Sequence, residues 1–481
     1  MCYNDIMKQC GKCFLHSSYF NLFQCRASDE NPVLLYCIHG GVPSFWIFPD
    51  FHALIAQNSA RNSVPLYGGD SSTMPSLYGL DFLRGKLSSK SIRVNLRYQY
   101  YDMKQTMRKI SALIPPEFRS LTYSLGWCAK AVDSLADRIV PDGFDNDSMQ
   151  ISEIFRLNHS DILYDSSVLS ALISACCFLY IGWNQSGYPT LQVVDGGNAT
   201  GIIDPVTNLL TEGYAVLKRD EHGSPLTEAY LKAGSTEIYE SGKLTDVFSH
   251  AAPFALLVPI INRPDAKRPF GHSRISRACM DITQSALRTM LRTEVAAEFY
   301  SVPQKYIVGL SEDAEFNNRA ATLSSFLRFS RDEDGNNPSL GQFQNGSIEP
   351  FLDHIKTLAS LFAAETSLTL DDLGFTTENP SSVDAIRASH ENLRLTARRA
   401  QRNFGTGFIN AGYLAACIRD NYSYDRSAFA DVRCRWLPIF EPDASMLGVL
   451  GDAILKINQS SEGFMGARNI RALTGLRSDA E

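Results

Sequence analysis

Apolar side chains between residues 115 and 143 follow the spacing of an amphipathic helix. After Pro115-Pro116 they recur at alternating three- and four-residue steps, at Phe118, Leu121, Leu125, Cys128, Val132, Leu135 and Ile139. Such a stripe lies on one face of a helix, and burial of each large side chain would contribute roughly 1.5–3 kcal/mol. Pro141 and Gly143 predict where the helix ends. The chain therefore has to build a packed core around this helix.

A different pattern, that of short strands, occupies residues 178–262. Gly, Asn, Asp and Pro separate five β-prone runs, which are Phe178–Trp183, Thr190–Val194, Tyr214–Leu217, Glu237–Tyr239 and Ala255–Ile261. Helical spacing is present over 150–182 and returns at 272–300, 350–364, 382–404, 406–420 and 443–458. We therefore predict an α+β fold that is mainly helical.

Length and charge limit the possible classes of protein. At 481 residues the chain is long enough for two or three packed units. Its formal net charge is -7, whereas a protein that grips DNA tightly usually has a basic excess. The balance argues against a tight, static DNA-binding protein. It is compatible with a protein that lets DNA slide past.

No segment predicts a membrane span or a secretory signal. The longest apolar run, Val168–Trp183, covers about 16 residues, fewer than the ~20 that a spanning helix needs, and Ser170, Ser174 and Gly182 interrupt it. Without export, the eleven cysteines would remain thiols in a reducing cytoplasm. We expect a protein that is made in the cytoplasm and has no membrane partner.

The first forty residues hold five cysteines, which are Cys2, Cys10, Cys13, Cys25 and Cys37. With His16 and His39 they suggest a zinc site, but no second Cys-x-x-Cys or His-x-x-x-His pair follows Cys13. We predict no metal there. Residues 1–75 are interpreted as an atypical N-terminal extension outside the native fold, with the working chain beginning near Met74.

Motifs that carry catalysis are missing from the sequence. A nucleotide-driven motor would need Gly-x-x-x-x-Gly-Lys-Ser/Thr, and neither this motif nor His-Glu-x-x-His nor Gly-x-Ser-x-Gly occurs. His390-Glu391 lacks a second histidine one turn later, so we interpret the pair as part of a solvated helix face. We predict no catalytic residue and no cofactor. The alternative is a metal-dependent nuclease that uses loop carboxylates such as Glu312-Asp313 or Asp332–Asp334.

Arginines form stripes on two predicted helices. The candidates for sequence-independent contact with DNA phosphates are Arg274, Arg277, Arg288 and Arg292 on the first helix and Arg387, Arg394, Arg398 and Arg402 on the second. The alternative is that they form ion pairs with acidic side chains of the same or a neighbouring subunit, such as Asp281, Glu294, Glu298, Asp384 and Glu391.

Four segments, taken in order, resemble the portal proteins of long-tailed phages and their prophages. They are Tyr100-Tyr101-Asp102 with Pro115-Pro116 and the helix through Trp127 to Phe144; Val258-Pro259 to Arg268-Pro269-Phe270-Gly271 and on to Tyr306; Ala363-Ala364-Glu365-Thr366 with Asn379-Pro380 to Arg387; and Trp436 to Pro438 with Gly451-Asp452-Ala453. Together they cover about residues 95–475, and residues 1–75 match nothing in the family.

The resemblance implies a ring of identical subunits, usually twelve, at one capsid vertex, through which double-stranded DNA is packaged and ejected. It implies a virion protein, assembled in the host cytoplasm, that contacts the terminase large subunit, the major capsid and scaffold proteins and a head–tail adaptor. Portal subunits have wing, stem, clip and crown regions. Residues 95–185 would form a helical wing region, 186–265 a strand-rich wing or clip region, 266–330 the channel-proximal stem helix and a following strand, 331–381 a loop and helix of the wing or tunnel, and 382–481 the crown.

A closed ring needs two different complementary surfaces on each subunit. DNA must also pass without being held, because several strong phosphate contacts together would slow it. A second alternative to the portal is another structural protein of the phage head or neck. An adaptor is usually far shorter than this chain.

Overall fold

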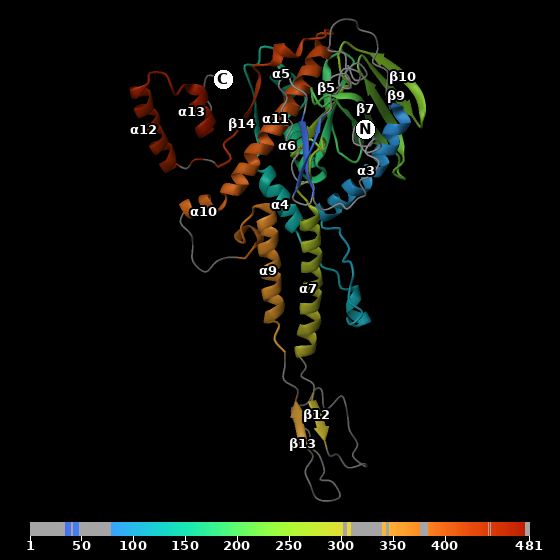
Figure 1. Cartoon of the computed structure of the whole chain (residues 1–481), viewed down its shortest axis with the longest axis vertical. Coiled ribbons are helices and arrows are strands. Elements are labelled where there is room, and N and C mark those ends of the chain that lie inside the picture. Colours follow the sequence, from blue (N-terminus) through green and yellow to red (C-terminus); the bar gives the residue numbers. More distant parts are fainter. Residues whose placement is uncertain are drawn as a thin grey trace, which may run out of the picture. The chain divides into compact units, whose positions relative to one another are not determined.

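The computed structural model describes residues 34–39, 42–47, 78–301, 305–308, 339–342, 346–375, 383–440, 442 and 444–476. The chain divides into two compact units, Met1–Pro75 and Ser76–Glu481. In the first unit the described part is an antiparallel hairpin of β1 (Leu34–His39) and β2 (Val42–Ile47) (Figure 1). The side chains of the N-terminal cysteines, for which we predicted no metal, lie outside the described residues.

The second unit contains both helices and strands. Its helices are α3 (Gly79–Tyr101), α4 (Trp127–Ala136), α5 (Ile151–Leu157), α6 (Ser160–Ser174), α7 (Arg277–Ser301), α9 (Glu349–Thr366), α10 (Val383–Ser389), α11 (Glu391–Arg419), α12 (Ala444–Ser460) and α13 (Ala467–Thr474). Its strands are β3 (Pro141–Asp145), β4 (Cys176–Trp183), β5 (Pro189–Val194), β6 (Ala199–Ile203), β7 (Leu210–Arg219), β8 (Pro225–Lys232), β9 (Ser235–Glu240), β10 (Lys243–Ser249), β11 (Leu257–Ile261), β12 (Lys305–Val308), β13 (Ser339–Gln342) and β14 (Arg433–Trp436). The predicted class, α+β and mainly helical, is confirmed.

A three-stranded antiparallel sheet of order β11-β4-β5 lies within the main core. Cys177 and its cross-strand partner Ile260 point to the same face. There the Cys177 thiol donates to a carbonyl of α6, and Ile260 lies against Gly407 of α11. The adjacent Phe178 points to the opposite face, where it meets the ring of Phe270. Both faces of the sheet are therefore covered, which explains why β4 and β11 are apolar at almost every position.

A five-stranded antiparallel sheet, of order β10-β9-β8-β7-β6, adjoins this core. Helix α3 packs on it through Leu83 and Leu87, which form a small separate cluster with Tyr214, Val216 and Tyr230. On the same helix, Arg84 forms an ion pair with the buried Glu228 of β8 at 2.6 Å. The edge strand β10 is exposed at all seven positions.

The helix predicted over residues 118–139 is shorter than its apolar stripe suggests. Residues 116–120 form a 3-10 turn, residues 121–126 are irregular, and α4 begins only after Gly126. From Cys128 to Ile139 the predicted apolar positions are buried, but Leu121 is 37% exposed. The segment Thr122–Ser124 consists of weak helix formers, so the spacing alone does not maintain a helix there.

Helices α7 and α9 pack against each other, and β12 and β13 pair in the segment between them (Figure 1). The helix predicted from residue 272 begins at Arg277, because hydrogen bonds to other segments hold the preceding backbone. The His272 amide donates to the Asn262 carbonyl, and the Arg274 amide donates to the Leu172 carbonyl. The predicted loop at 331–347 contains β13, and most of that loop lies outside the described residues.

The C-terminal region differs from its prediction in the boundaries of two helices, and it also contains α13 and β14, which were not predicted. The helices expected at 382–404 and 406–420 are instead α10 and a continuous 29-residue α11, which are separated at His390. Strand β14 pairs with β3 from early in the chain, and Arg435 of β14 forms an ion pair with Asp142 at 2.8 Å. No helix among the described residues combines the length and apolar character needed to cross a membrane.

Glycine permits the close contact between α11 and β11. A Cβ atom added at Gly407 would lie 2.6 Å from Ile260 Cδ1 and 3.2 Å from the Pro259 carbonyl oxygen. We expect Gly407→Ala to lower the free energy of unfolding by about 1–3 kcal/mol, because the helix has to move away from the strand. Gly448 of α12 has open space around it, so Gly448→Ala should be neutral or stabilising by up to about 1 kcal/mol. Urea unfolding of both variants compares them, and equal effects would contradict this packing.

Candidate functional site

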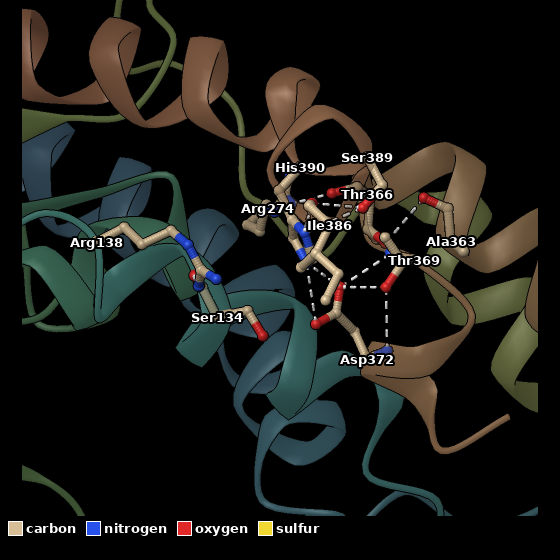
Figure 2. Close-up of polar contacts among 10 residues, drawn as sticks. All are labelled: Ser134, Arg138, Arg274, Ala363, Thr366, Thr369, Asp372, Ile386, Ser389 and His390. Carbon is tan, nitrogen blue, oxygen red and sulfur yellow. Dashed lines mark hydrogen bonds and ion pairs between the residues drawn. The ribbon is translucent and has the colours of Figure 1, made fainter. Parts of the chain in front are cut away.

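Arg274, the first of the predicted DNA-contacting arginines, is buried (Figure 2). Its guanidinium donates to the Ala131 carbonyl of α4 at 3.2 Å and to the Thr366 carbonyl at the C-terminal end of α9. The predicted helical face shared by Arg274 and the other arginines is wrong, since Arg274 precedes α7. Its side chain joins two helices and is only 9% exposed.

The other three arginines of the first stripe do lie on α7. At about 100° per residue, Arg277, Arg288 and Arg292 fall within an arc of about 60°. Arg277 and Arg292 are exposed. Arg288 is half-buried, and it donates to Ser285 Oγ at 2.8 Å and to the Arg108 carbonyl at 3.4 Å. In the single subunit, Arg277 and Arg292 are therefore accessible to a binding partner.

The second stripe is divided by the break at His390. Arg387 lies on α10, whereas the other three arginines lie on α11. Arg394 binds Glu391 with two hydrogen bonds of 2.7 and 2.6 Å, so the alternative of a local ion pair holds for this residue. Arg398 and Arg402 are exposed.

The sequence predicted that His390 lies on a solvated helix face, and this prediction is wrong. Its Nε2 lies 3.2 Å from Asp372 Oδ2, and its Nδ1 lies 2.8 Å from the Ile386 carbonyl oxygen (Figure 2). Asp372, in the 3-10 turn Asp371–Leu373, also accepts hydrogen bonds from the Thr369 amide and hydroxyl, both at 2.9 Å. The contact fixes the α10–α11 break to the segment that follows α9.

This contact predicts a stability that depends on pH. Burial raises the pKa of Asp372, but hydrogen bonds from Thr369 and the nearby His390 outweigh burial and hold that pKa below its ordinary value. A lowered carboxyl pKa stabilises the fold above the unfolded pKa of about 3.9, and this stability is lost as pH falls through the folded pKa. Asp372→Asn should lower the free energy of unfolding by about 1 kcal/mol at neutral pH.

The difference between wild type and Asp372→Asn should shrink below about pH 4, where the wild-type carboxylate becomes protonated. Urea unfolding at neutral and acid pH measures it. Asp371→Asn is the matched control, because Asp371 is exposed and precedes the contact in the same turn. A difference that is unchanged in acid would contradict the assignment.

Helix α3 carries a set of cations that was not predicted as a site from the sequence. Lys86, Lys90, Arg93 and Arg97 follow steps of four, three and four residues and share one helix face. The Lys86 and Lys90 ammonium groups lie 5.1 and 5.0 Å from the centre of the Phe270 ring, two residues after Arg268. We call these five side chains, Lys86, Lys90, Arg93, Arg97 and Arg268, the α3 cationic surface. The step pattern in the sequence was the signal that could have revealed its helical part.

The described residues contain no group of three or more His, Cys, Asp or Glu side chains arranged to hold a metal ion. The carboxylates considered for a nuclease, at 312–313 and 332–334, lie outside those residues. In the described part of the chain, the candidate functional features are therefore the clustered cations and the buried polar contacts of Arg274 and Asp372.

Two curated relatives span about two thirds of the chain. The portal protein of Mycobacterium phage L5 is 25% identical over 354 residues, which is 68% of this chain and 71% of the relative. The portal protein of Mycobacterium phage D29 is 25% identical over 342 residues, which is 66% of this chain and 69% of the relative. This chain is similar to phage portal proteins. The resemblance expected from the four sequence segments is thus confirmed.

Chains of gene transfer agent (GTA) particles are similar to this chain at lower sequence identity. One, from the virion of the native GTA particle, is 13% identical with a TM-score of 0.40 and covers 73% of this chain and 90% of its own. Another, from the neck of an empty GTA particle computed with C6 symmetry, is 12% identical with a TM-score of 0.41 and covers 81% and 99%. Both TM-scores are low. No protein-family model matches the sequence.

Proposed function

We propose that this chain is a portal subunit of a tailed phage or prophage. Twelve copies of it close into a ring at one capsid vertex, and double-stranded DNA passes through the ring during packaging and ejection. The observation that carries the proposal is the similarity to two portal proteins over about two thirds of each chain. The ring is a virion component that assembles in the host cytoplasm.

The partners follow from the same role. The terminase large subunit docks on the ring and supplies the energy for DNA movement, since the chain has no nucleotide-binding motif. The major capsid and scaffold proteins and a head–tail adaptor contact the same ring. The subunit itself performs no catalysis and needs no cofactor.

The regions of a portal subunit are assigned by order along the chain. Residues 95–185 belong to the wing and the strand-rich 186–265 to the wing or clip. Residues 266–330 belong to the channel-proximal stem helix and a following strand, 331–381 to the wing or tunnel, and 382–481 to the crown. The packed pair α7 and α9, joined through β12 and β13, supports a stem within this order.

Of the predicted arginines, the exposed ones are the candidates for weak DNA contact in the channel. Arg277 and Arg292 on α7 and Arg398 and Arg402 on α11 are accessible in the subunit. Phosphate contacts of this kind do not depend on base sequence. The overall acidic charge of the subunit keeps such contacts transient.

The test is the mass and symmetry of purified particles. We expect native mass spectrometry and negative-stain microscopy to show a closed ring with a central hole. A chain that begins at Ser76, the start of the second compact unit, should form the same ring. A persistent monomer or an open filament would contradict the proposal. A nicking assay with Mg²⁺ tests the nuclease alternative, which requires cutting that Asp332→Ala abolishes.

A further inference from the structure

In the described part of the chain, the α3 cationic surface lacks the ion pairs that other cations of the structure form. Arg84, on the same helix, is paired with Glu228 at 2.6 Å, and Arg394 and Arg435 are paired at 2.6 and 2.8 Å. Across the ranges that the structure describes, no carboxylate forms an ion pair with any of the five cations of the surface.

Arg97 is close enough to Arg93 and to Arg268 to be repelled by both. Burial lowers the pKa of Arg97, and the neighbouring charges of Arg93 and Arg268 lower it further. No described residue accepts a hydrogen bond from these three guanidinium groups. The nearby Asp265 is already bound, since it accepts the amides of Lys267 and Arg268 and lies 3.4 Å from His272. An oxyanion at this surface would reduce the repulsion between the arginines and accept hydrogen bonds from their guanidinium groups.

The two lysines hold the surface in place. The Lys86 ammonium donates to the Gly201 carbonyl at 2.7 Å, and the Lys90 ammonium lies 3.2 Å from the Cys176 thiol. Both also lie over the Phe270 ring, an arrangement that favours a cation. The loop that carries Arg268 is thereby attached to α3, so side chains about 170 residues apart in sequence act together.

Positive charge is concentrated at the α3 cationic surface, although the protein as a whole is acidic. Residues 79–101 and 263–272 contain eight Lys and Arg against two Asp, although the whole chain has a net charge of -7. The four cations of α3 extend over about 16 Å of helix. A stripe of Lys and Arg on one helix is typical of a surface that meets a phosphate backbone. Because arginine is also frequent at protein–protein interfaces, an acidic face of a second copy is the competing partner, and ring formation by the variant described below tests it.

We propose that the α3 cationic surface binds the phosphate backbone of double-stranded DNA without regard to base sequence. Arg93, Arg97 and Arg268 make the phosphate contacts, while Lys86 and Lys90 position the surface. The source of the DNA rests on the proposed portal function. The surface itself includes none of the arginines that the sequence analysis predicted for the channel.

The experiment measures the binding of a short, fluorescently labelled DNA duplex to the full-length protein by anisotropy at several salt concentrations. In one variant Arg93, Arg97 and Arg268 are all changed to Gln. Its affinity should be at least about tenfold weaker, and the slope of log affinity against log salt should fall by about three, because three phosphate contacts are lost. Two unrelated duplex sequences should give equal affinities.

The matched control removes the same charge elsewhere. Arg156, Lys218 and Lys243 are exposed and lie outside the surface, so changing these three to Gln should leave affinity and slope near the wild-type values. An unchanged affinity in the first variant, or an equal loss in the control, would overturn the proposal. So would a first variant that loses the ring formed by wild type, because the cations would then hold neighbouring subunits together.

The same samples separate this proposal from the portal function. Microscopy reports whether a ring forms, and anisotropy reports whether the surface binds DNA. If wild type forms rings and the first variant binds DNA as wild type does, only the surface assignment fails. If wild type forms no ring, the portal function fails, and the comparison of the two variants still decides the surface.

Discussion

Phe408→Ala should lower the free energy of unfolding by about 3–5 kcal/mol, because it leaves a cavity at the junction of four elements. Phe408 on α11 is fully buried. Its ring lies 4.9 Å from Tyr164 of α6, 6.2 Å from Phe155 of α5 and 6.4 Å from Trp436 of β14, measured between ring centres. Aromatic pairs add about 0.5–1.5 kcal/mol beyond the area that they bury.

Urea unfolding followed by far-UV circular dichroism measures this effect. Phe464→Ala is the control, since Phe464 is 68% exposed and its loss should change stability by less than about 0.5 kcal/mol. Similar midpoints for the two variants would show that α11 is not anchored through this cluster. Phe408→Leu, which keeps most of the volume, should recover more than half of the loss.

Arg274→Met should be destabilising by about 3 kcal/mol, because it removes two charge-assisted donors from buried carbonyl groups. The Thr366 carbonyl lies in the last turn of α9, where carbonyls have no partner within the helix and a cation is favourable. Arg274 supplies that partner and also reaches the Ala131 carbonyl of α4. Methionine keeps the length and apolar character of the side chain but donates nothing.

Arg277→Met is the matched control, since it removes an exposed arginine three residues later and should change stability by less than about 0.5 kcal/mol. Arg274→Lys should fall between the two, because a single ammonium lacks the planar fork that reaches two acceptors. Thermal unfolding of the three variants ranks them. Equal melting temperatures for Arg274→Met and Arg277→Met would contradict a structural role for Arg274.

The fold class was predictable because periodic burial leaves a direct mark on the sequence. From Cys128 to Ile139 the apolar steps match buried positions, and four of the five β-prone runs of 178–262 fall within strands. The fifth, Ala255–Ile261, begins two residues before β11. The ends of helices were less predictable. Residues 118–125 continue the apolar spacing without forming a long helix, and residues 272–276 are kept out of α7 by hydrogen bonds from distant segments. The spacing of apolar residues along the sequence does not reveal such hydrogen bonds.

The arginines show the same limit at the level of the site. Their spacing correctly placed Arg277, Arg288 and Arg292 on one face of α7, but it gave no sign that Arg274 is buried between α4 and α9. The α3 cations were visible as a stripe. Their lack of acidic partners was not, because it depends on how the fold brings residues 263–272 to the helix.

The unequal burial of α11 has a mechanical consequence. Every residue from Asn410 to Cys417 is buried, whereas the N-terminal half is packed on one face only, with Leu393, Ala397 and Ala400 buried and Arg398, Arg399 and Arg402 exposed. At 29 residues the helix is about 43 Å long. A continuous helix that is packed against the core along its length moves as one body. A load applied near α10 would therefore be passed along the helix to β11, which lies against Gly407.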